Sequence, residues 1–267
     1  MAIEAGHTVG SAFTHGRPAL ITYLMAGFPD RATSGMSVRA AALCGADLIE
    51  LGVPFADPLA DGPAIVRAAG VARAQPGGFG LSQTLELARE LTSSGNLPPI
   101  VLMSYLNPLL TYGFPRLAAD AASAGVAGFI IPDLPPDSPI AAKWLAAAAG
   151  CGLQTVFLVA PTSTANRISV VTRTSQGFVY VVSSVGVTGE RSELPPHLPA
   201  LVERVRAAAG SGLPVAVGFG VSTPEQALAV ARIADGVIVG SAIVKRQTDP
   251  HELGEFVSAL ASAVHGA

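Results

Sequence analysis

Two carboxylates stand out in the segment 47–63, because its other residues are mostly apolar or turn-forming. Glu50 falls in the apolar run 48–51, which is typical of a short strand buried on both faces of a parallel sheet. Burial disfavours the charged form of a carboxyl group and would raise the pKa of Glu50 toward neutrality. Such a glutamate can both donate and accept a proton within one turnover. We therefore predict that Glu50 is a catalytic acid and base.

Asp61 and Asp57 follow in a segment that cannot form regular structure. Prolines and glycine interrupt it at Pro54, Pro58, Gly62 and Pro63. The aspartates are therefore expected on a loop at the carboxyl end of the strand, where parallel sheets carry their chemistry. We predict that Asp61 is the second member of a catalytic pair with Glu50. The alternative is that Glu50 is an ion-paired core residue and the aspartates are turn or cap residues.

The composition indicates one large domain that binds a small molecule. The chain has 267 residues, of which 50% are hydrophobic and 13% are charged, so it can bury a single large core. Its net charge is -3, and its lysines and arginines form no basic stripe. We therefore expect neither a nucleic acid nor an anionic membrane surface as a partner.

The ends of the chain and its cysteines also limit the functional class. The segment 1–18 has no continuous apolar core, and no later run reaches the roughly 18 apolar residues that span a bilayer. We therefore expect a cytoplasmic protein. Cys44 and Cys151 fit neither a disulfide framework nor a zinc site, so we interpret both as small core residues.

The hydrophobic pattern alternates between strands and helices along the whole chain. Eight short apolar runs are expected to be strands, at 20–25, 47–51, 100–105, 128–131, 154–159, 178–182, 214–217 and 236–239. Ala- and Leu-rich helical patterns separate them. This alternation predicts a single (β/α)8 TIM barrel over residues 18–267, preceded by an N-terminal extension of uncertain order at 1–17. An open doubly wound sheet is less favoured, because residues 26–30 carry no glycine fingerprint after the first strand.

In such a barrel the residues at the ends of the strands share one rim. Tyr23, Tyr105 and Tyr180 would lie near Glu50 there, with Asn107 and Asp133. We predict that the three tyrosines contact the substrate. For each tyrosine taken alone, packing in the core with a solvated hydroxyl is the alternative.

Glycine turns after the last two strands indicate a phosphate site. The sequences VGFGV at 217–221 and VGSA at 239–242 would let backbone N–H groups approach an anion, with a short helix beginning at Ser241. Glycines at barrel corners also occur for steric reasons. The long connection 183–195 is expected to be either a lid, with Thr188 and Gly189 as its active-site residues, or a disordered segment.

Four motifs in the chain carry a family resemblance. These are ELGVPFADPLADGP at 50–63, GVTG at 186–189, GFG at 218–220 and GSAIVK at 240–245. In these motifs the chain resembles the alpha subunit family of tryptophan synthase. The resemblance runs from about Pro18 to the end of the chain. It implies cleavage of indole-3-glycerol phosphate to indole and glyceraldehyde 3-phosphate by retro-aldol chemistry, without cofactor or metal. It also implies that Glu50 is the acid/base catalyst, that Asp61 binds the indole nitrogen, and that Tyr23 and Tyr180 line the indole pocket. Thr188 would belong to the lid, and the phosphate would be held by Gly189, Phe219, Gly220, Gly240 and Ser241.

Two features depart from the family pattern. Residues 1–16 contain three glycines and little periodicity, so the long amphipathic helix that usually covers the barrel floor is not expected. Ser184 stands where the family's lid often carries an arginine, which leaves the coupling of lid closure to a partner open.

Three functional hypotheses follow from the resemblance. The leading one is a lyase that works with a pyridoxal-phosphate beta subunit in a heterotetramer of two alpha and two beta subunits. The second is a stand-alone lyase of specialised metabolism. The third, a non-catalytic barrel that regulates a partner, is disfavoured by the intact Glu50 and Asp61 pair.

Overall fold

A computed structural model of the chain describes residues 8–95, 97–183, 195–218 and 220–267, and the structural statements below refer to these residues. The strands are β1 (Ala19–Met25), β2 (Leu48–Gly52), β3 (Ile100–Met103), β4 (Gly128–Ile130), β5 (Gln154–Val156), β6 (Leu158–Val159), β7 (Val179–Val182), β8 (Val215–Gly218) and β9 (Gly236–Val239). The helices are η2 (Val9–Phe13), α1 (Arg31–Leu43), α2 (Pro63–Arg73), α3 (Leu81–Ser93), α4 (Leu106–Tyr112), α5 (Phe114–Ser123), α6 (Pro139–Gly150), α7 (Ala165–Thr174), α8 (Leu198–Ala209), α9 (Pro224–Ala231), α10 (Ser241–Arg246) and α11 (Pro250–His265).

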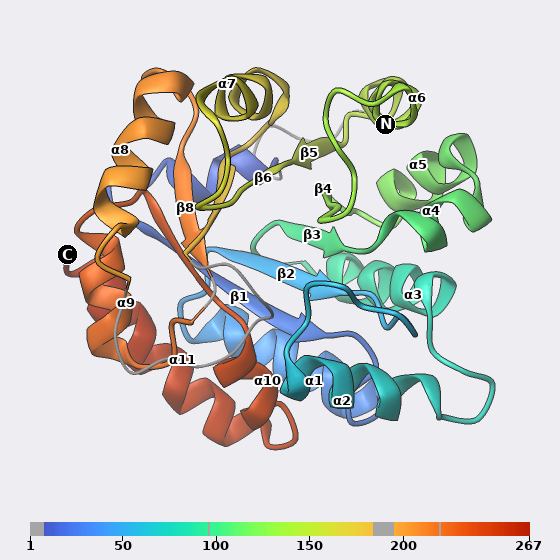
Figure 1. The fold of residues 1–267 in the computed structure, drawn as a ribbon. Coiled ribbons are helices and arrows are strands. Elements are labelled where there is room, and N and C mark those ends of the chain that lie inside the picture. The colour runs from blue at the N-terminus through green and yellow to red at the C-terminus, as the bar shows by residue number, and fades with distance from the viewer. Residues whose placement is uncertain (1–7, 96, 184–194, 219) are drawn as a thin grey trace.

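The nine strands form one parallel sheet in the order β5-β4-β3-β2-β1-β9-β8-β7-β6 (Figure 1). The two edge strands, β5 and β6, are consecutive in the chain and are separated only by Phe157. They are two halves of one barrel strand, so the sheet curls into an eight-stranded barrel with the helices outside it. The predicted (β/α)8 fold is confirmed.

The fifth strand and one helix differ from the prediction. The sequence predicts a continuous strand over 154–159, but the N–H of Phe157 donates to Oγ of Ser175, 3.1 Å away, rather than to a neighbouring strand. This side-chain bond separates β5, which pairs with β4, from β6, which pairs with β7. Helix α4 was not predicted, because Pro108 obscures the helical pattern, although proline is tolerated in the first turn of a helix.

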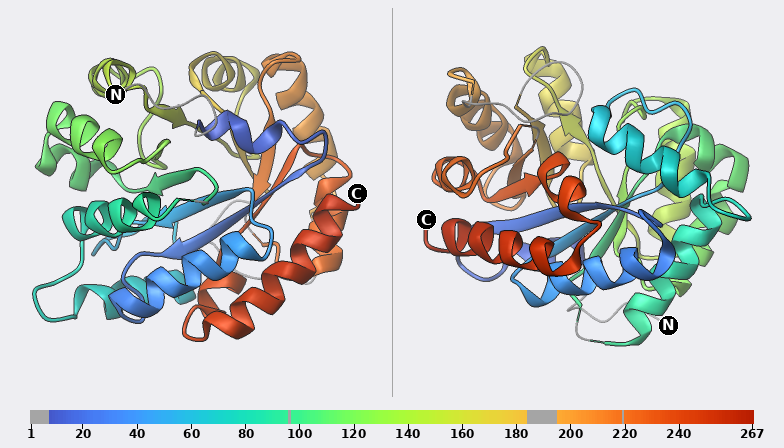
Figure 2. Two further views of the ribbon diagram at one scale, coloured as in Figure 1. Left: turned by 180° about the vertical axis from the view of Figure 1, so that it is seen from behind. Right: turned by 90° about the horizontal axis from the view of Figure 1, so that it is seen from below.

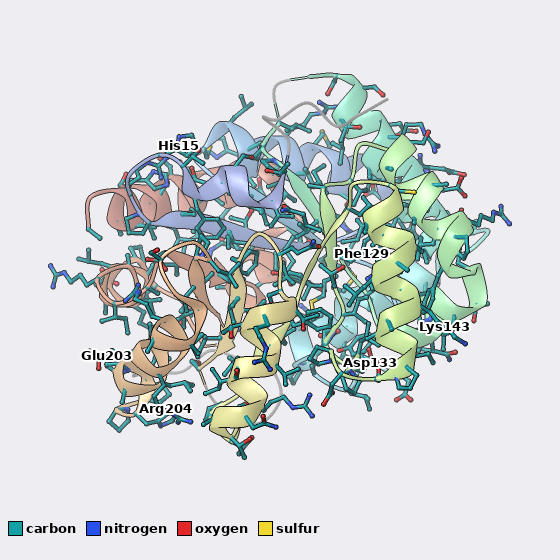
Figure 3. All side chains as sticks on the ribbon, turned by 90° about the horizontal axis from the view of Figure 1, so that it is seen from above. His15, Phe129, Asp133, Lys143, Glu203 and Arg204 are labelled. Carbon is teal, nitrogen blue, oxygen red and sulfur yellow. The ribbon has the colours of Figure 1, made fainter. Side chains whose placement is uncertain are left out.

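The strands are buried on both faces, as expected for a parallel barrel. Every residue of β1, β2, β3, β4, β7, β8 and β9 is buried. Their side chains alternate between the barrel interior and the layer of helices. Phe129 of β4 is buried, whereas charged side chains such as Lys143 and Glu203 project outward from α6 and α8 (Figure 3). Among the described residues no helix is long and apolar enough to cross a membrane.

The short helix η2 covers the amino ends of the strands, opposite the rim. Val9 is fully buried, and a Cβ atom at Gly177 would overlap its side chain. The N–H of Gly10 donates to Oε1 of Gln154 at the start of β5, and the rings of Phe13 and Phe178 lie 5.4 Å apart. Figure 2 shows this segment lying across the strand ends. A single turn of helix therefore closes this end of the barrel.

Asp47 connects both ends of the chain to the start of β2. Its carboxylate accepts two hydrogen bonds from Arg17, at 2.9 and 3.0 Å, and one from the Leu20 N–H at 2.8 Å. Nε2 of His265, at the end of α11, lies 2.8 Å from Oδ2 of the same carboxylate. Figure 2 shows α11 running beside α1. The bond from His265 to Asp47 therefore joins the end of α11 to the residue that precedes β2.

Candidate functional site

Glu50 occupies the middle of β2 and is the charged residue of an otherwise apolar strand. It is paired in register with Tyr23 on β1 and Val101 on β3, and only 1% of it is exposed. Its Oε2 atom is buried and has no hydrogen-bond partner among the described residues. Burial, and secondarily the negative charge of Asp61, raise the pKa of Glu50 to about 8. Glu50 is therefore a carboxylic acid at neutral pH, and its proton is not committed to another protein group in the described part of the chain.

Asp61 lies on the β2–α2 loop, two residues before α2 begins. It is 7% exposed, and its Oδ1 atom is buried without a hydrogen-bond partner among the described residues. Burial raises the pKa of Asp61 to about 6, and a hydrogen bond from the Tyr105 hydroxyl opposes that rise. At neutral pH the two neighbouring carboxyl groups therefore differ, since Asp61 is mostly ionised and Glu50 is mostly protonated.

Tyr105 is held in place by several contacts around its ring and hydroxyl. The hydroxyl accepts a hydrogen bond from the Ala60 N–H, 3.0 Å away, and donates to Asp61. The ring stacks on Phe55 at 5.6 Å between centroids. The next N–H, that of Leu106, donates to Asp133 in the segment that follows β4. Burial, with Asp61 nearby, raises the pKa of Tyr105 above its usual range, so the hydroxyl stays protonated and remains a donor.

Tyr23 and Tyr180 face the same interior region from β1 and β7. Burial raises the pKa of both hydroxyls, and the charges of Asp61 and Glu50 raise them further. Tyr23 packs over Gly52 at the end of β2, and Tyr180 packs over Gly218 at the end of β8. A Cβ atom at either glycine would overlap the tyrosine hydroxyl, so the glycines make room for the rings. The result is an aromatic region around the two carboxyl groups that suits a flat apolar ring.

The predicted phosphate turns lie next to one another, because β8 and β9 are paired. Gly220, with φ of 91°, follows β8 in a backbone conformation that favours glycine. Gly240 is the N-cap of α10, which begins at Ser241 as the sequence predicts. The first N–H groups of a helix have no partners within it, so they can meet an anion. Four residues of the sequence-based analysis, Thr188, Gly189, Phe219 and Ser184, lie outside the described residues.

Some predicted rim residues do not join this group. Asp57 and Asn107 are exposed, whereas Asp133 is partly buried and accepts the Leu106 N–H. The sequence analysis also missed Gln247, which is fully buried next to β1. A polar residue three positions after the buried Val244 offers no pattern by which its contacts could be recognised.

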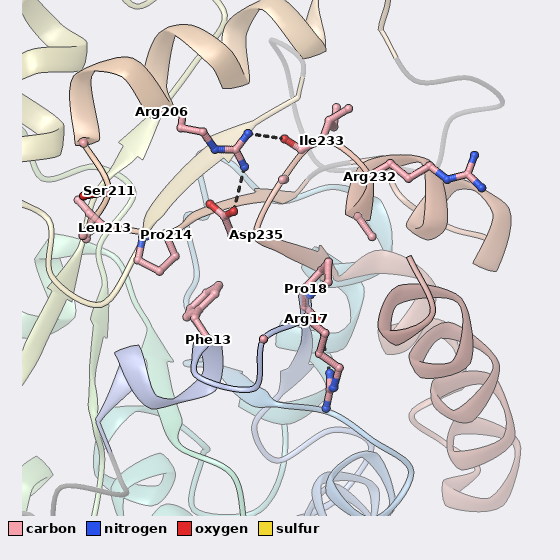
Figure 4. Close-up of a pocket in the computed structure, with 15 residues that line it drawn as sticks. Phe13, Arg17, Pro18, Arg206, Ser211, Leu213, Pro214, Arg232, Ile233 and Asp235 are labelled. Carbon is pink, nitrogen blue, oxygen red and sulfur yellow. Dashed lines mark hydrogen bonds and ion pairs between the residues drawn. The ribbon is translucent and has the colours of Figure 1, made fainter.

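Away from the rim, the described structure offers a cavity but no metal site. The described residues contain no group of three or more His, Cys, Asp or Glu side chains that could hold a metal ion. A cavity of about 580 Å³ opens at the opposite end of the barrel, between η2, α8 and β9 (Figure 4). Two of the three arginines that line it are already engaged, because Arg206 bonds to Asp235 and Arg17 bonds to Asp47. The candidate site is therefore the rim that carries Glu50 and Asp61.

Comparison with known proteins shows which family the chain belongs to. Residues 11–263 match the family model described as tryptophan synthase alpha chain. A tryptophan synthase alpha chain from Citrifermentans bemidjiense is 49% identical over 255 residues, which cover 93% of each chain. One from Phenylobacterium zucineum is 46% identical over 246 residues, covering 91% of this chain and 86% of the relative.

Solved structures show the same relationship. A chain of Mycobacterium tuberculosis tryptophan synthase superposes with a TM-score of 0.87 and 42% identity, covering 97% of this chain and 98% of the other. Tryptophan synthase subunit alpha from Legionella pneumophila superposes with a TM-score of 0.86 and 32% identity, covering 97% and 98%. Both the family model and the relatives extend over nearly the whole barrel. The chain belongs to the tryptophan synthase alpha chain family.

Proposed function

We propose that this chain cleaves indole-3-glycerol phosphate to indole and glyceraldehyde 3-phosphate, with Glu50 and Asp61 as its catalytic residues. The observation that supports this most directly is the buried carboxyl pair. Burial raises the pKa of Glu50 to about 8 and that of Asp61 to about 6, so one carboxyl group is acidic and the other ionised near pH 7. Two carboxyl groups whose pKa values are pushed apart can take the separate roles of acid and anionic stabiliser.

The reaction requires a proton at C3 of the indole ring and the loss of a proton from the glycerol hydroxyl. Protonated Glu50 delivers its proton to C3, which gives a cation delocalised over the ring. The bond between C3 and the glycerol carbon then breaks, and its electron pair restores the indole. The hydroxyl oxygen becomes the aldehyde oxygen as the Glu50 carboxylate accepts its proton, so Glu50 returns to its starting form.

Asp61 stabilises the positive charge that forms on the indole ring. Its ionised carboxylate accepts a hydrogen bond from the indole N1–H and stabilises the positive charge that develops on the ring. The interaction strengthens as the cation forms. It therefore lowers the activation free energy of cleavage more than it tightens binding of the substrate in its ground state. The Oδ1 atom of Asp61, which has no hydrogen-bond partner in the described part of the chain, is available for this contact.

The remaining predicted site residues divide between the two halves of the substrate. Tyr23 and Tyr180 are placed to flank the indole ring, and Tyr105 orients Asp61. The turns at Gly220 and at Gly240 and Ser241 would bind the phosphate through backbone N–H groups. Thr188, Gly189 and Phe219 remain predictions from the sequence as lid and phosphate residues.

The partner we propose is the beta subunit of tryptophan synthase, in a heterotetramer of two alpha and two beta subunits in the cytoplasm. Membership of the alpha chain family supports it. A stand-alone lyase is the alternative. The β2–α2 loop and the candidate site both lie at the carboxyl end of the barrel strands. Substrate and partner would therefore both contact this loop.

Indole formation by the purified chain, with and without a beta subunit, tests these proposals together. We expect measurable cleavage by the chain alone and faster cleavage in the complex. A substrate analogue should also bind more tightly in the complex, by about 5- to 150-fold for couplings of this kind. No cleavage in either case would reject the lyase. If the isolated chain is fully active and the beta subunit does not change its affinity for the analogue, the chain is a stand-alone lyase.

A further inference from the structure

Gln247 is a fully buried polar side chain that follows helix α10, and the proposed chemistry does not use it. Its amide nitrogen donates to the carbonyl oxygens of Met25, at 2.7 Å, and Phe28, at 2.8 Å. Its Oε1 atom accepts a hydrogen bond from the Met25 N–H at 2.9 Å. Both amide hydrogens and the oxygen are therefore bonded to the backbone at the end of β1.

The bonds of Gln247 take the place of hydrogen bonds that β9 would make to β1 if it continued. Strand β9 is paired with β1 only as far as Val239, opposite Thr22, whereas β1 continues to Met25. The next N–H, that of Ala26, bonds to Gly52 on the β2 side, so the polar groups of Met25 face the side that β9 has left. A buried backbone N–H or C=O needs a partner. The primary amide of Gln247 supplies both, as a peptide group of a neighbouring strand would.

The same residue joins α10 to a second element. The backbone carbonyl of Gln247 accepts a hydrogen bond from Oγ of Ser37 on α1, at 2.9 Å. Helix α10 begins at Ser241, six residues before Gln247, and Gly240 is its N-cap. A Cβ atom at Gly240 would lie 3.7 Å from Cβ of Tyr23, so this turn packs directly on the tyrosine of β1. Helix α10 is thus held against β1 at both of its ends.

We propose that Gln247 is a positioning residue that sets the spacing between the Gly240 and Ser241 turn and Tyr23. The inference rests on the proposed function, in which that turn binds the phosphate and Tyr23 flanks the indole ring. Glu50 and Asp61 belong to β2 and to the loop that follows it, and Gln247 bonds to neither. Loss of the amide should therefore move the phosphate turn and leave the carboxyl pair in place.

The test is Gln247→Met, which keeps the length of the side chain and removes its hydrogen bonds. We expect KM for indole-3-glycerol phosphate to rise about tenfold or more, because small displacements of a binding group are costly. The inhibition constant of inorganic phosphate should rise by a similar factor. The value of kcat should change less than about threefold, since the proton-transfer groups are not displaced.

The matched control is Gln154→Met, which removes a similar amide from the floor of the barrel, where it accepts the Gly10 N–H. It should leave KM and phosphate inhibition unchanged even if it lowers the unfolding temperature. Gln247→Glu keeps an acceptor for the Met25 N–H, but its second oxygen, when ionised, faces the carbonyl oxygens of Met25 and Phe28. It should therefore raise KM at least as much as Gln247→Met, and it is the second variant if Gln247→Met does not fold.

A folded Gln247 variant with KM and phosphate inhibition within about twofold of the wild-type values would overturn the positioning role. So would an equal rise in KM in the Gln154→Met control. If the wild-type chain itself does not cleave the substrate, the proposed function fails, and the inference fails with it. The wild-type rate therefore separates the two kinds of failure.

Discussion

The hydroxyl of Tyr105 donates a hydrogen bond to Asp61, and this bond opposes the effect of burial on the same carboxyl group. Burial raises the pKa of Asp61 to about 6, and without the tyrosine hydroxyl it would be higher. Tyr105 thereby helps to keep Asp61 ionised at the pH at which Glu50 is protonated. The Ala60 N–H donates to the Tyr105 hydroxyl, and Asp133 accepts from the N–H of the next residue, Leu106. Both the hydroxyl and the backbone after the ring are therefore held before substrate binds.

Tyr105→Phe should therefore raise the pKa of Asp61 and shift the acid limb of the pH–rate profile to higher pH. The rate of indole formation should fall most below pH 7, where more Asp61 becomes protonated, and least above it. Steady-state rates between pH 5.5 and 8.5 measure the shift. An acid limb that stays in place would mean that Tyr105 does not influence the ionisation of Asp61.

The wild-type profile should be bell-shaped. Activity requires Asp61 ionised, above a pKa of about 6, and Glu50 protonated, below a pKa of about 8, so the maximum is expected near pH 7. In Asp61→Asn the acid limb should disappear while the alkaline limb remains, and a profile with both limbs intact would assign the lower pKa to another group.

Glu50→Gln should lower kcat by about 100-fold or more, because the swap is nearly isosteric and removes only the proton function. Circular dichroism and thermal unfolding should show an intact fold. Near-normal turnover by the folded variant would rule out Glu50 as the acid/base catalyst. Glu90→Gln, on the exposed face of α3, is the matched control and should keep full activity.

The same variant should change how stability depends on pH. The pKa of Glu50 is raised from 4.5 to about 8 in the folded state, so its contribution to stability is fully present below pH 4.5 and is lost as pH rises toward 8. The wild-type chain should lose on the order of a few kcal/mol across that range from this group. Glu50→Gln should be more stable than the wild type at pH 8.5 in urea unfolding, and equal stability there would contradict the buried-charge interpretation.

Asp61→Asn should lower kcat while KM stays within a modest factor, because the charge of Asp61 matters most when the ring cation forms. Steady-state kinetics at pH 7 separate the two parameters. A rise in KM with unchanged kcat would instead make Asp61 a ground-state binding residue.

Asp47→Asn should destabilise the fold by about 1–3 kcal/mol, because it weakens a buried carboxylate that binds Arg17, Leu20 and His265. Denaturant unfolding measures the change. Asp137→Asn is the control, since its pair with Arg167 is exposed on both sides and should contribute little. If both variants lose the same free energy of unfolding, the buried contacts of Asp47 contribute no more to stability than the exposed pair.

The sequence by itself determined the barrel and pointed to its chemistry. Alternating apolar runs and helical patterns depend on local spacing, which is visible in the chain without knowledge of the fold. A carboxylate inside an apolar strand, followed by a loop of prolines, singled out Glu50 and Asp61 for the same reason. Burial of both groups is confirmed, and their catalytic roles stay predictions.

Only the tertiary structure decided which contacts tune these residues. The bonds between Gln247 and Met25 join positions 222 residues apart, and Tyr105 reaches Ala60 across 45 residues. The break at Phe157 likewise depends on Ser175, which belongs to a different element. Hydrogen bonds of this kind require exact distance and direction between groups that the chain brings together only on folding. Residue type and spacing carry no record of that geometry, so the sequence could not reveal it.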